Sequence, residues 1–163
     1  LHIWMCKKSL YDEVGIYRIP SAEVLDFLLR CLDSGKKIAN IPEYLYKVRF
    51  REGNTATSTG LTQRKSIEFA RRLHKERMMK RQRSDSFSDI LLEKAIAASY
   101  LETVTYRIAS KYHFAYLRHK SKSKVRALIY RLLAVLFSPK HQLREIWSRR
   151  KYKKMLTVKT REK

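Results

Sequence analysis

The first sixty residues carry one clear helical pattern of apolar positions. Four leucines recur at the i, i+3, i+4, i+7 spacing that lines one face of a helix: Leu25, Leu28, Leu29 and Leu32. Four charged residues fall on the opposite stripe: Glu23, Asp26, Arg30 and Asp33. The pattern predicts a helix capped by Ser21 and ended by Gly35, with its leucines in a core and its charges in solvent. A shorter helix from Leu10 is predicted to stop at Gly15.

Strand patterns flank this helix. The segments His2–Ser9 and Lys37–Ile41 are predicted as short strands, and Tyr44–Arg51 as a longer one. In Tyr44–Arg51, aromatic and aliphatic residues alternate with residues that are mostly Lys and Arg. Period-two alternation predicts one buried face and one basic face.

Beyond Leu61 the pattern is helical throughout. Thr62–Arg83 predicts one basic helix, and the stretch from Ile90 to about Lys120 predicts one long helix or a broken one. A polar hinge, Lys120–Lys124, precedes the strongly apolar Val125–Phe137. Ser138 and Pro139 signal that a helix restarts there. Two domains are therefore expected, residues 1–60 with mixed helices and strands and residues 61–163 as a basic helical extension.

Charge points to an anionic partner. The chain has 37 Lys and Arg against 15 Asp and Glu, a formal charge of +22, and 44% hydrophobic residues. The excess predicts nucleic acid, an anionic membrane surface or a phosphorylated substrate, and the hydrophobic content argues against a disordered polycation. The two cysteines fit buried structural roles in a reducing compartment, and the five histidines show no metal-binding spacing. No run reaches the roughly 20 apolar residues of a membrane span.

The stretch Met5–Thr57 resembles the C-terminal, acceptor-side half of a family 2 glycosyltransferase of the GT-A fold. The matching elements are "EVG", the helix that begins "AEVLDFLLR", "GKKIANIPE" and "LYKVRFREGNTAT". The resemblance implies an α+β fragment, the end of a GT-A α/β domain, followed by a mainly α-helical basic extension. It also implies inverting transfer of a sugar from a nucleotide-sugar to a hydroxyl of a glycan acceptor in surface glycan synthesis.

The donor-binding half of such an enzyme is missing from this sequence. Family members hold the diphosphate with Mg²⁺ or Mn²⁺ on an Asp-x-Asp pair in a Rossmann-like N-terminal half, and no such pair precedes Leu61. A chain that begins at Leu1 is expected to be a piece of a longer protein. We therefore expect this chain alone to bind no metal and to be inactive, with the divalent ion needed only in a full-length enzyme.

By the resemblance, the catalytic candidates are Glu23 and Asp26. The family's proton-accepting Asp falls at Val24, which cannot accept a proton, so a neighbouring carboxylate would have to act as the base. Two alternatives remain. Glu23 can be a favourable first-turn charge, and Asp26 can form a surface i, i+4 pair with Arg30.

The substrate-binding candidates are Arg30, Arg49 and Arg51. Arg51 stands where many family members place a metal-holding His; a guanidinium cannot ligate a metal, but it can donate two hydrogen bonds to a diphosphate. The alternative for Arg49 and Arg51 is a solvated strand face.

The basic helices suggest a second partner. Val125–Phe137 and Gln142–Leu156 combine Leu, Ile, Phe and Trp with Arg and Lys, which is typical of helices that lie in a membrane interface. The sequence thus predicts a cytoplasmic protein, peripheral at the inner face of the membrane. The alternative is a non-enzymatic basic helical protein that binds nucleic acid, although no known nucleic-acid motif is present. A third possibility is that the apolar stripes pack on one another while Lys and Arg solvate their backs.

Overall fold

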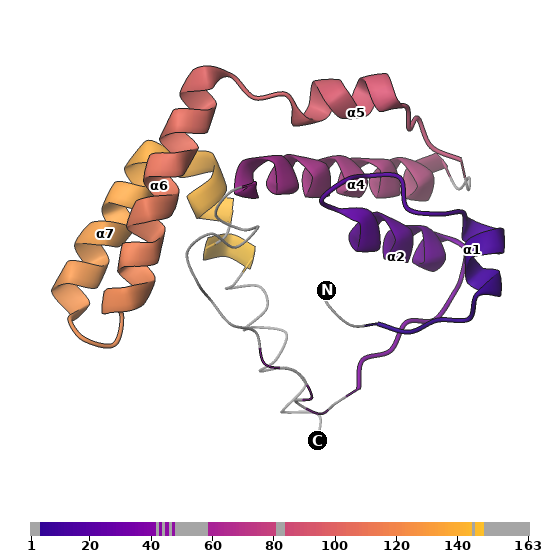
Figure 1. The fold of residues 1–163 in the computed structure, drawn as a ribbon, viewed down its shortest axis with the longest axis horizontal. Coiled ribbons are helices and arrows are strands. Elements are labelled where there is room, and N and C mark those ends of the chain that lie inside the picture. The colour runs from indigo at the N-terminus through magenta and orange to yellow at the C-terminus, as the bar shows by residue number, and fades with distance from the viewer. Residues whose placement is uncertain are drawn as a thin grey trace. The chain divides into compact units, whose positions relative to one another are not determined.

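The computed structural model describes residues 4–41, 43, 45, 47, 59–80, 84–144 and 146–148. Its helices, labelled in Figure 1, are α1 (Ser9–Val14), α2 (Glu23–Asp33), α4 (Gly60–Lys80), α5 (Asp89–Ile96), α6 (Tyr100–His119) and α7 (Lys124–Phe137). Residues 139–144 and 146–148 are helical as well. The chain divides into two compact units, Leu1–Ala98 and Ser99–Lys163, each described here by itself. The sequence division at residue 60 falls inside the first unit, where α4 packs against α2.

No strand occurs among the described residues, so the expected α+β class is wrong. Trp4–Lys7 and Lys37–Ile41 have no regular structure, and Tyr44–Arg51 lies almost entirely outside the described residues. A short strand was expected at Lys37–Ile41, where the structure has no regular element and the side chains of Ile38 and Ile41 are exposed. A GT-A domain is built on a sheet, and an all-helical arrangement therefore overturns the resemblance to family 2 glycosyltransferases.

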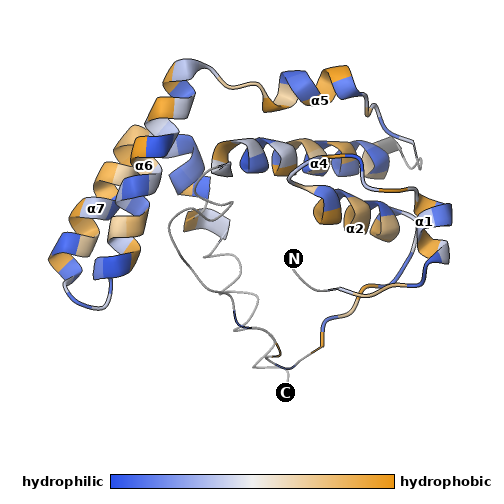
Figure 2. Ribbon diagram, in the orientation of Figure 1, coloured by the Kyte–Doolittle hydropathy of each residue, from blue (hydrophilic) through white to orange (hydrophobic). Residues whose placement is uncertain are grey.

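The first unit has an apolar core between α4, α5 and the loop before α2. Its buried members are Ile19, Ala22, Phe69, Ala70, Leu73 and Leu92. Figure 1 shows α2 beside α4, and Figure 2 shows that both helices carry mixed polar and apolar residues. A second cluster forms around Phe27 of α2, which is fully buried against the rings of Trp4, Tyr11 and Tyr17.

Helix α2 is turned relative to the sequence prediction. Its buried residues are Asp26, Phe27, Arg30 and Cys31, whereas Leu32 is exposed. The supposed solvent-facing charges Asp26 and Arg30 therefore lie inside, because partners from elsewhere in the chain compensate their burial.

The ends of α1 and α2 follow local signals, but neither helix begins at a capping side chain. Gly15 (φ 86°) ends α1 and Gly35 (φ 76°) follows the end of α2, as predicted. Ser21 does not cap α2: the N-cap residue is Ala22, and the backbone N–H of Ser21 instead donates to Glu23 Oε1 at 2.8 Å.

In the second unit, α6 and α7 form an antiparallel hairpin across the predicted hinge (Figure 1). Each helix begins at a serine cap: Ser99 Oγ accepts the Glu102 N–H at 3.1 Å, and Ser123 Oγ accepts the Arg126 N–H at 3.4 Å. Tyr112 of α6 stacks on two α7 rings, Tyr130 and Phe137. Small buried residues let the helices approach closely: Ala109, Ala127 and Ala134.

The helical segment after Pro139 also packs on α6. His141 is buried and meets the Tyr106 ring edge-on, with ring centroids 5.4 Å apart. Of the two alternatives predicted from Ile90 to about Lys120, one long helix or a broken one, the structure has the broken helix: α5 ends at Ile96 and α6 begins at Tyr100.

Candidate functional site

Asp26 and Arg30, two of the residues singled out in the sequence, contact one another inside the first unit. Arg30 Nε donates to Asp26 Oδ2 at 3.0 Å, and Arg30 also donates to the carbonyls of Val14 and of Ile16, the latter at 2.6 Å. Asp26 is fully buried. This is the i, i+4 pair expected from the spacing, but it lies in the interior and not on the surface. A carboxylate held this way is closed to an incoming hydroxyl.

The other predicted site residues are not brought to that pair. Glu23 is exposed at the start of α2, where its carboxylate accepts the Ser21 N–H. Arg49 and Arg51 lie outside the described residues. The described residues thus assemble no catalytic pair from Glu23 and Asp26.

Arg18, which the sequence analysis missed, is the centre of the ion-pair network around Asp26. Its Nε and Nη2 donate to Asp26 at 2.9 and 3.1 Å, and its Nη1 and Nη2 donate to Asp85 at 3.0 and 2.6 Å. The ring of Phe87 lies 4.6 Å from the guanidinium carbon. Arg18 therefore joins the loop before α2, α2 itself and the segment after α4.

The network continues along α4 through Arg77. Arg77 Nε donates to Asp33 Oδ2 at 2.6 Å, and its Nη1 pairs with Asp85. His74 Nδ1 lies 2.7 Å from Asp33 Oδ1, although out of line for a regular hydrogen bond. Arg77 could have been found from the sequence, because it falls on the same helical face as the buried Ala70 and Leu73.

Three arginines meet three aspartates in this network: Arg18, Arg30 and Arg77 face Asp26, Asp33 and Asp85. Burial alone would raise the pKa of Asp85, but hydrogen bonds from Arg18, Arg77 and the Phe87 N–H hold it below its ordinary value. Burial alone would likewise lower the pKa of Arg18, and its hydrogen bonds to Asp26 and Asp85 raise it instead. Asp85 and Arg18 therefore keep their charges, and the network acts as a structural clamp.

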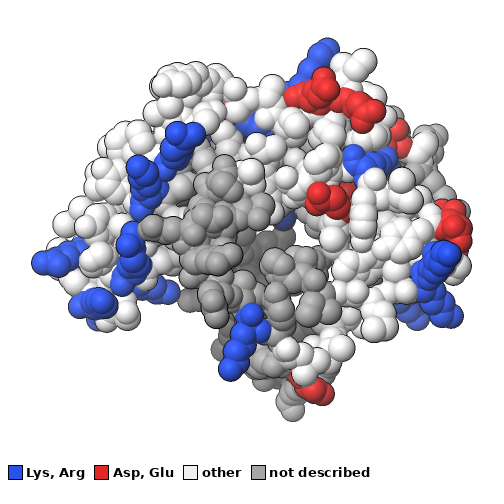
Figure 3. Space-filling view, viewed as in Figure 1, with Lys and Arg blue, Asp and Glu red and all other residues white. Residues whose placement is uncertain are grey.

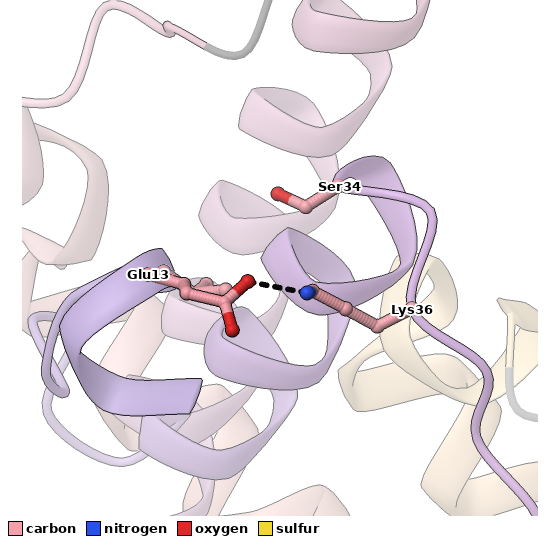
Figure 4. Close-up of a pocket in the computed structure, with 4 residues that line it drawn as sticks. Glu13, Ser34 and Lys36 are labelled. Atoms are coloured by element: carbon pink, nitrogen blue, oxygen red, sulfur yellow. Dashed lines mark hydrogen bonds and ion pairs between the residues drawn. The ribbon is translucent and has the colours of Figure 1, made fainter. Parts of the chain in front are cut away.

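A small cavity of about 230 Å³ opens beside α1, lined by Glu13, Val14, Ser34 and Lys36. Figure 4 shows Lys36 pointing at Glu13 across it, and the two form an ion pair. Its charged groups neutralise one another and its volume is below the usual range of ligand pockets. Among the described residues, no group of three or more His, Cys, Asp or Glu could hold a metal ion.

A different kind of surface lies on α7. Five aliphatic side chains recur at i, i+3, i+4, i+7 and i+11 and are 51–73% exposed: Val125, Leu128, Ile129, Leu132 and Leu136. We call these five residues the α7 stripe. The opposite face of α7 is the one that packs on α6 through Ala127 and Ala134. The α7 stripe is thus an apolar face held outward by the packing of the hairpin.

Cations gather at the turn that precedes the α7 stripe. Arg118, Lys120, Lys122, Lys124 and Arg126 are all exposed and are called the tip cations below. Figure 3 shows Lys and Arg standing out over α6 and α7, while Asp and Glu gather over the first unit. Residues 99–163 hold 18 of the 37 Lys and Arg but only three of the 15 Asp and Glu. The second unit therefore carries most of the charge of the chain.

In the described part of the chain, no helix has both the length and the apolar character needed to cross a bilayer. Comparison with known proteins gives no matching family model, no similar curated protein and no similar solved structure. Sugar transfer, which rested on the overturned resemblance, stays an untested prediction. Among the described residues, the α7 stripe with its tip cations is the surface best suited to a function.

Proposed function

We propose that the second unit attaches the protein to an anionic membrane surface, with α7 lying in the interface. The observation that carries the proposal is the α7 stripe, an exposed aliphatic face that begins beside a cluster of cations. Amphipathic helices of this kind bury the apolar face at the boundary of headgroups and acyl chains while the cations meet anionic headgroups.

The arrangement of charge fits a helix that lies flat. Lys124 and Arg126 stand at the start of α7, and Lys140 is exposed just beyond its end. Arg131, in the middle of the helix, turns toward α6, where its guanidinium lies 4.9 Å from the centre of the Tyr116 ring. The apolar middle of α7 would enter the interface while both ends stay at phosphate level. An anionic surface in a cell is chiefly the cytoplasmic leaflet, so we place attachment at the inner face of the membrane.

Nucleic acid is the competing partner, and the hairpin suits it less well. Proteins that hold single strands stack bases on exposed aromatic rings, but within the hairpin Tyr112 stacks on Tyr130 and on Phe137. Binding of a phosphate backbone would leave the aliphatic α7 stripe exposed to water. Charge, together with the exposed rings of Tyr100 and Trp147, is what would support binding to nucleic acid.

Co-flotation with vesicles tests the proposal. The chain should bind phosphatidylcholine vesicles that contain phosphatidylserine and bind pure phosphatidylcholine vesicles far less. Raised salt should weaken this binding without abolishing it, because screening acts on the cations and not on the α7 stripe. Tighter binding to duplex DNA than to the anionic vesicles at the same salt would reject the membrane in favour of nucleic acid.

A further inference from the structure

Trp147 is unusually exposed for a side chain of its size. It is 75% exposed in the helical segment that follows α7, and Leu143, one turn earlier, is 47% exposed. Tryptophan is highly buried on average in folded proteins. Two large apolar side chains four positions apart on an outward face therefore call for a partner.

The opposite face of this segment fixes its orientation. His141 and Gln142 are buried, and the His141 ring meets Tyr106 of α6 edge-on. At 100° per residue, Leu143 and Trp147 fall on the side of the helix that faces away from this packed pair. Lys140 and Arg144 are exposed on the same side. The segment repeats the design of α7, with one face packed on α6 and an apolar face beside cations.

We infer that Leu143 and Trp147 form a second membrane anchor, whose partner is the headgroup region of an anionic bilayer. This inference rests on the proposed function and extends it from one attachment point to two. The indole ring combines a large apolar body with a single N–H donor, the combination that concentrates tryptophan at membrane–water interfaces. Lys140 and Arg144 supply the charge complementary to anionic lipid.

Two anchors on one folded unit bind more tightly than either does alone, since the second contact is made within a molecule already at the surface. The second anchor starts directly after Ser138, so no flexible linker separates it from α7. Removing Trp147 should therefore weaken attachment while α7 still holds the protein at the membrane.

Intrinsic fluorescence tests this directly, because the chain has two tryptophans, Trp4 and Trp147. In a Trp4→Phe protein, emission comes from Trp147 alone. Adding phosphatidylserine-containing vesicles should shift it to shorter wavelength, and lipids brominated near the headgroup should quench it. In the matched Trp147→Phe protein, the remaining emission from Trp4 should not change.

Trp147→Ala should lower the vesicle partition coefficient roughly tenfold, and Trp147→Phe much less. Far-UV circular dichroism should be unchanged in both, since the side chain is exposed. If the Trp4→Phe protein binds the vesicles while Trp147 emission and quenching stay unchanged, the second anchor is wrong and α7 attachment stands. If no variant, nor the parent chain, binds vesicles, both proposals fall.

Discussion

Arg18 and Asp85 lie 67 positions apart in the sequence and are joined by two hydrogen bonds, of 2.6 and 3.0 Å. The same guanidinium also holds Asp26. This one side chain therefore fixes the segment after α4 against the loop before α2. The contact joins two distant parts of the first unit, so its loss should lower the stability of that whole unit.

Replacing Arg18 by Leu should lower the free energy of unfolding by about 3 kcal/mol. That is the lower end of the range for breaking a buried pair, because Arg30 still pairs with Asp26 and Arg77 with Asp85. Urea denaturation followed by circular dichroism measures the change. Arg107→Leu removes an exposed cation from α6 and should change the value by less than about 0.5 kcal/mol. Equal effects of the two substitutions would show that the network does not hold the fold.

The stability of the first unit should depend on Asp85 at acid pH. Its pKa in the folded protein is below its ordinary value of 3.8, because hydrogen bonds from Arg18, Arg77 and the Phe87 N–H outweigh the effect of burial. A lowered pKa contributes stability that is fully present above the unfolded-state pKa and is lost as pH falls toward the folded-state value. The urea midpoint should therefore drop as the pH falls below about 5. Asp85→Asn, though less stable at neutral pH, should show a smaller drop, and an unchanged drop would contradict this role.

The sequence predicted the helices where local signals decide, and failed where distant partners decide. Gly15 and Gly35 mark helix ends through their own backbone conformations, and Val125–Phe137 forms a helix from its own apolar residues. By contrast, the side of α2 that faces inward depends on partners outside the helix. Asp26 accepts hydrogen bonds from Arg18, in the loop before α2, and Asp33 accepts one from Arg77, 44 positions away. No spacing within α2 reveals those partners.

The strands and the candidate site failed for a related reason. The strand predicted at Lys37–Ile41 rested on a short apolar pattern, and a strand is stable only beside another strand. The predicted pair of Asp26 and Arg30 does form, but it is buried and not on the surface. Charged residues are rarely buried unless they are paired, and the further partners that allow this burial could not be seen from the spacing within α2. The apolar pattern of Val125–Phe137 was visible in the sequence, but the packing of α7 on α6 decides which of its apolar residues stay exposed as the α7 stripe.

The tip cations should set the electrostatic part of membrane attachment. Changing Lys120, Lys122 and Lys124 together to Gln should weaken binding to phosphatidylserine-containing vesicles by about 3 kcal/mol, at about 1 kcal/mol for each Lys near the surface. The salt dependence should become shallower. Vesicle co-sedimentation over a salt series measures both. The matched control changes three exposed lysines of the first unit, Lys7, Lys8 and Lys37, and should have a much smaller effect. A larger effect of the control would indicate that the membrane-binding surface lies on the first unit instead.

The most direct test of the account is the partition to anionic vesicles of a protein whose α7 stripe has been made polar. Leu128→Ser with Leu132→Ser removes two side chains that are 58% and 61% exposed, while the face of α7 that packs on α6 is left intact. The control, Met78→Ser with Met79→Ser, removes two comparably exposed apolar side chains from α4 of the first unit. Each leucine that enters the interface contributes up to about 1.5–3 kcal/mol. The account therefore predicts that the leucine variant loses at least about tenfold in partition with unchanged circular dichroism, and that the methionine variant binds like the parent chain. Undiminished binding of the leucine variant, or a loss confined to the methionine variant, would contradict it.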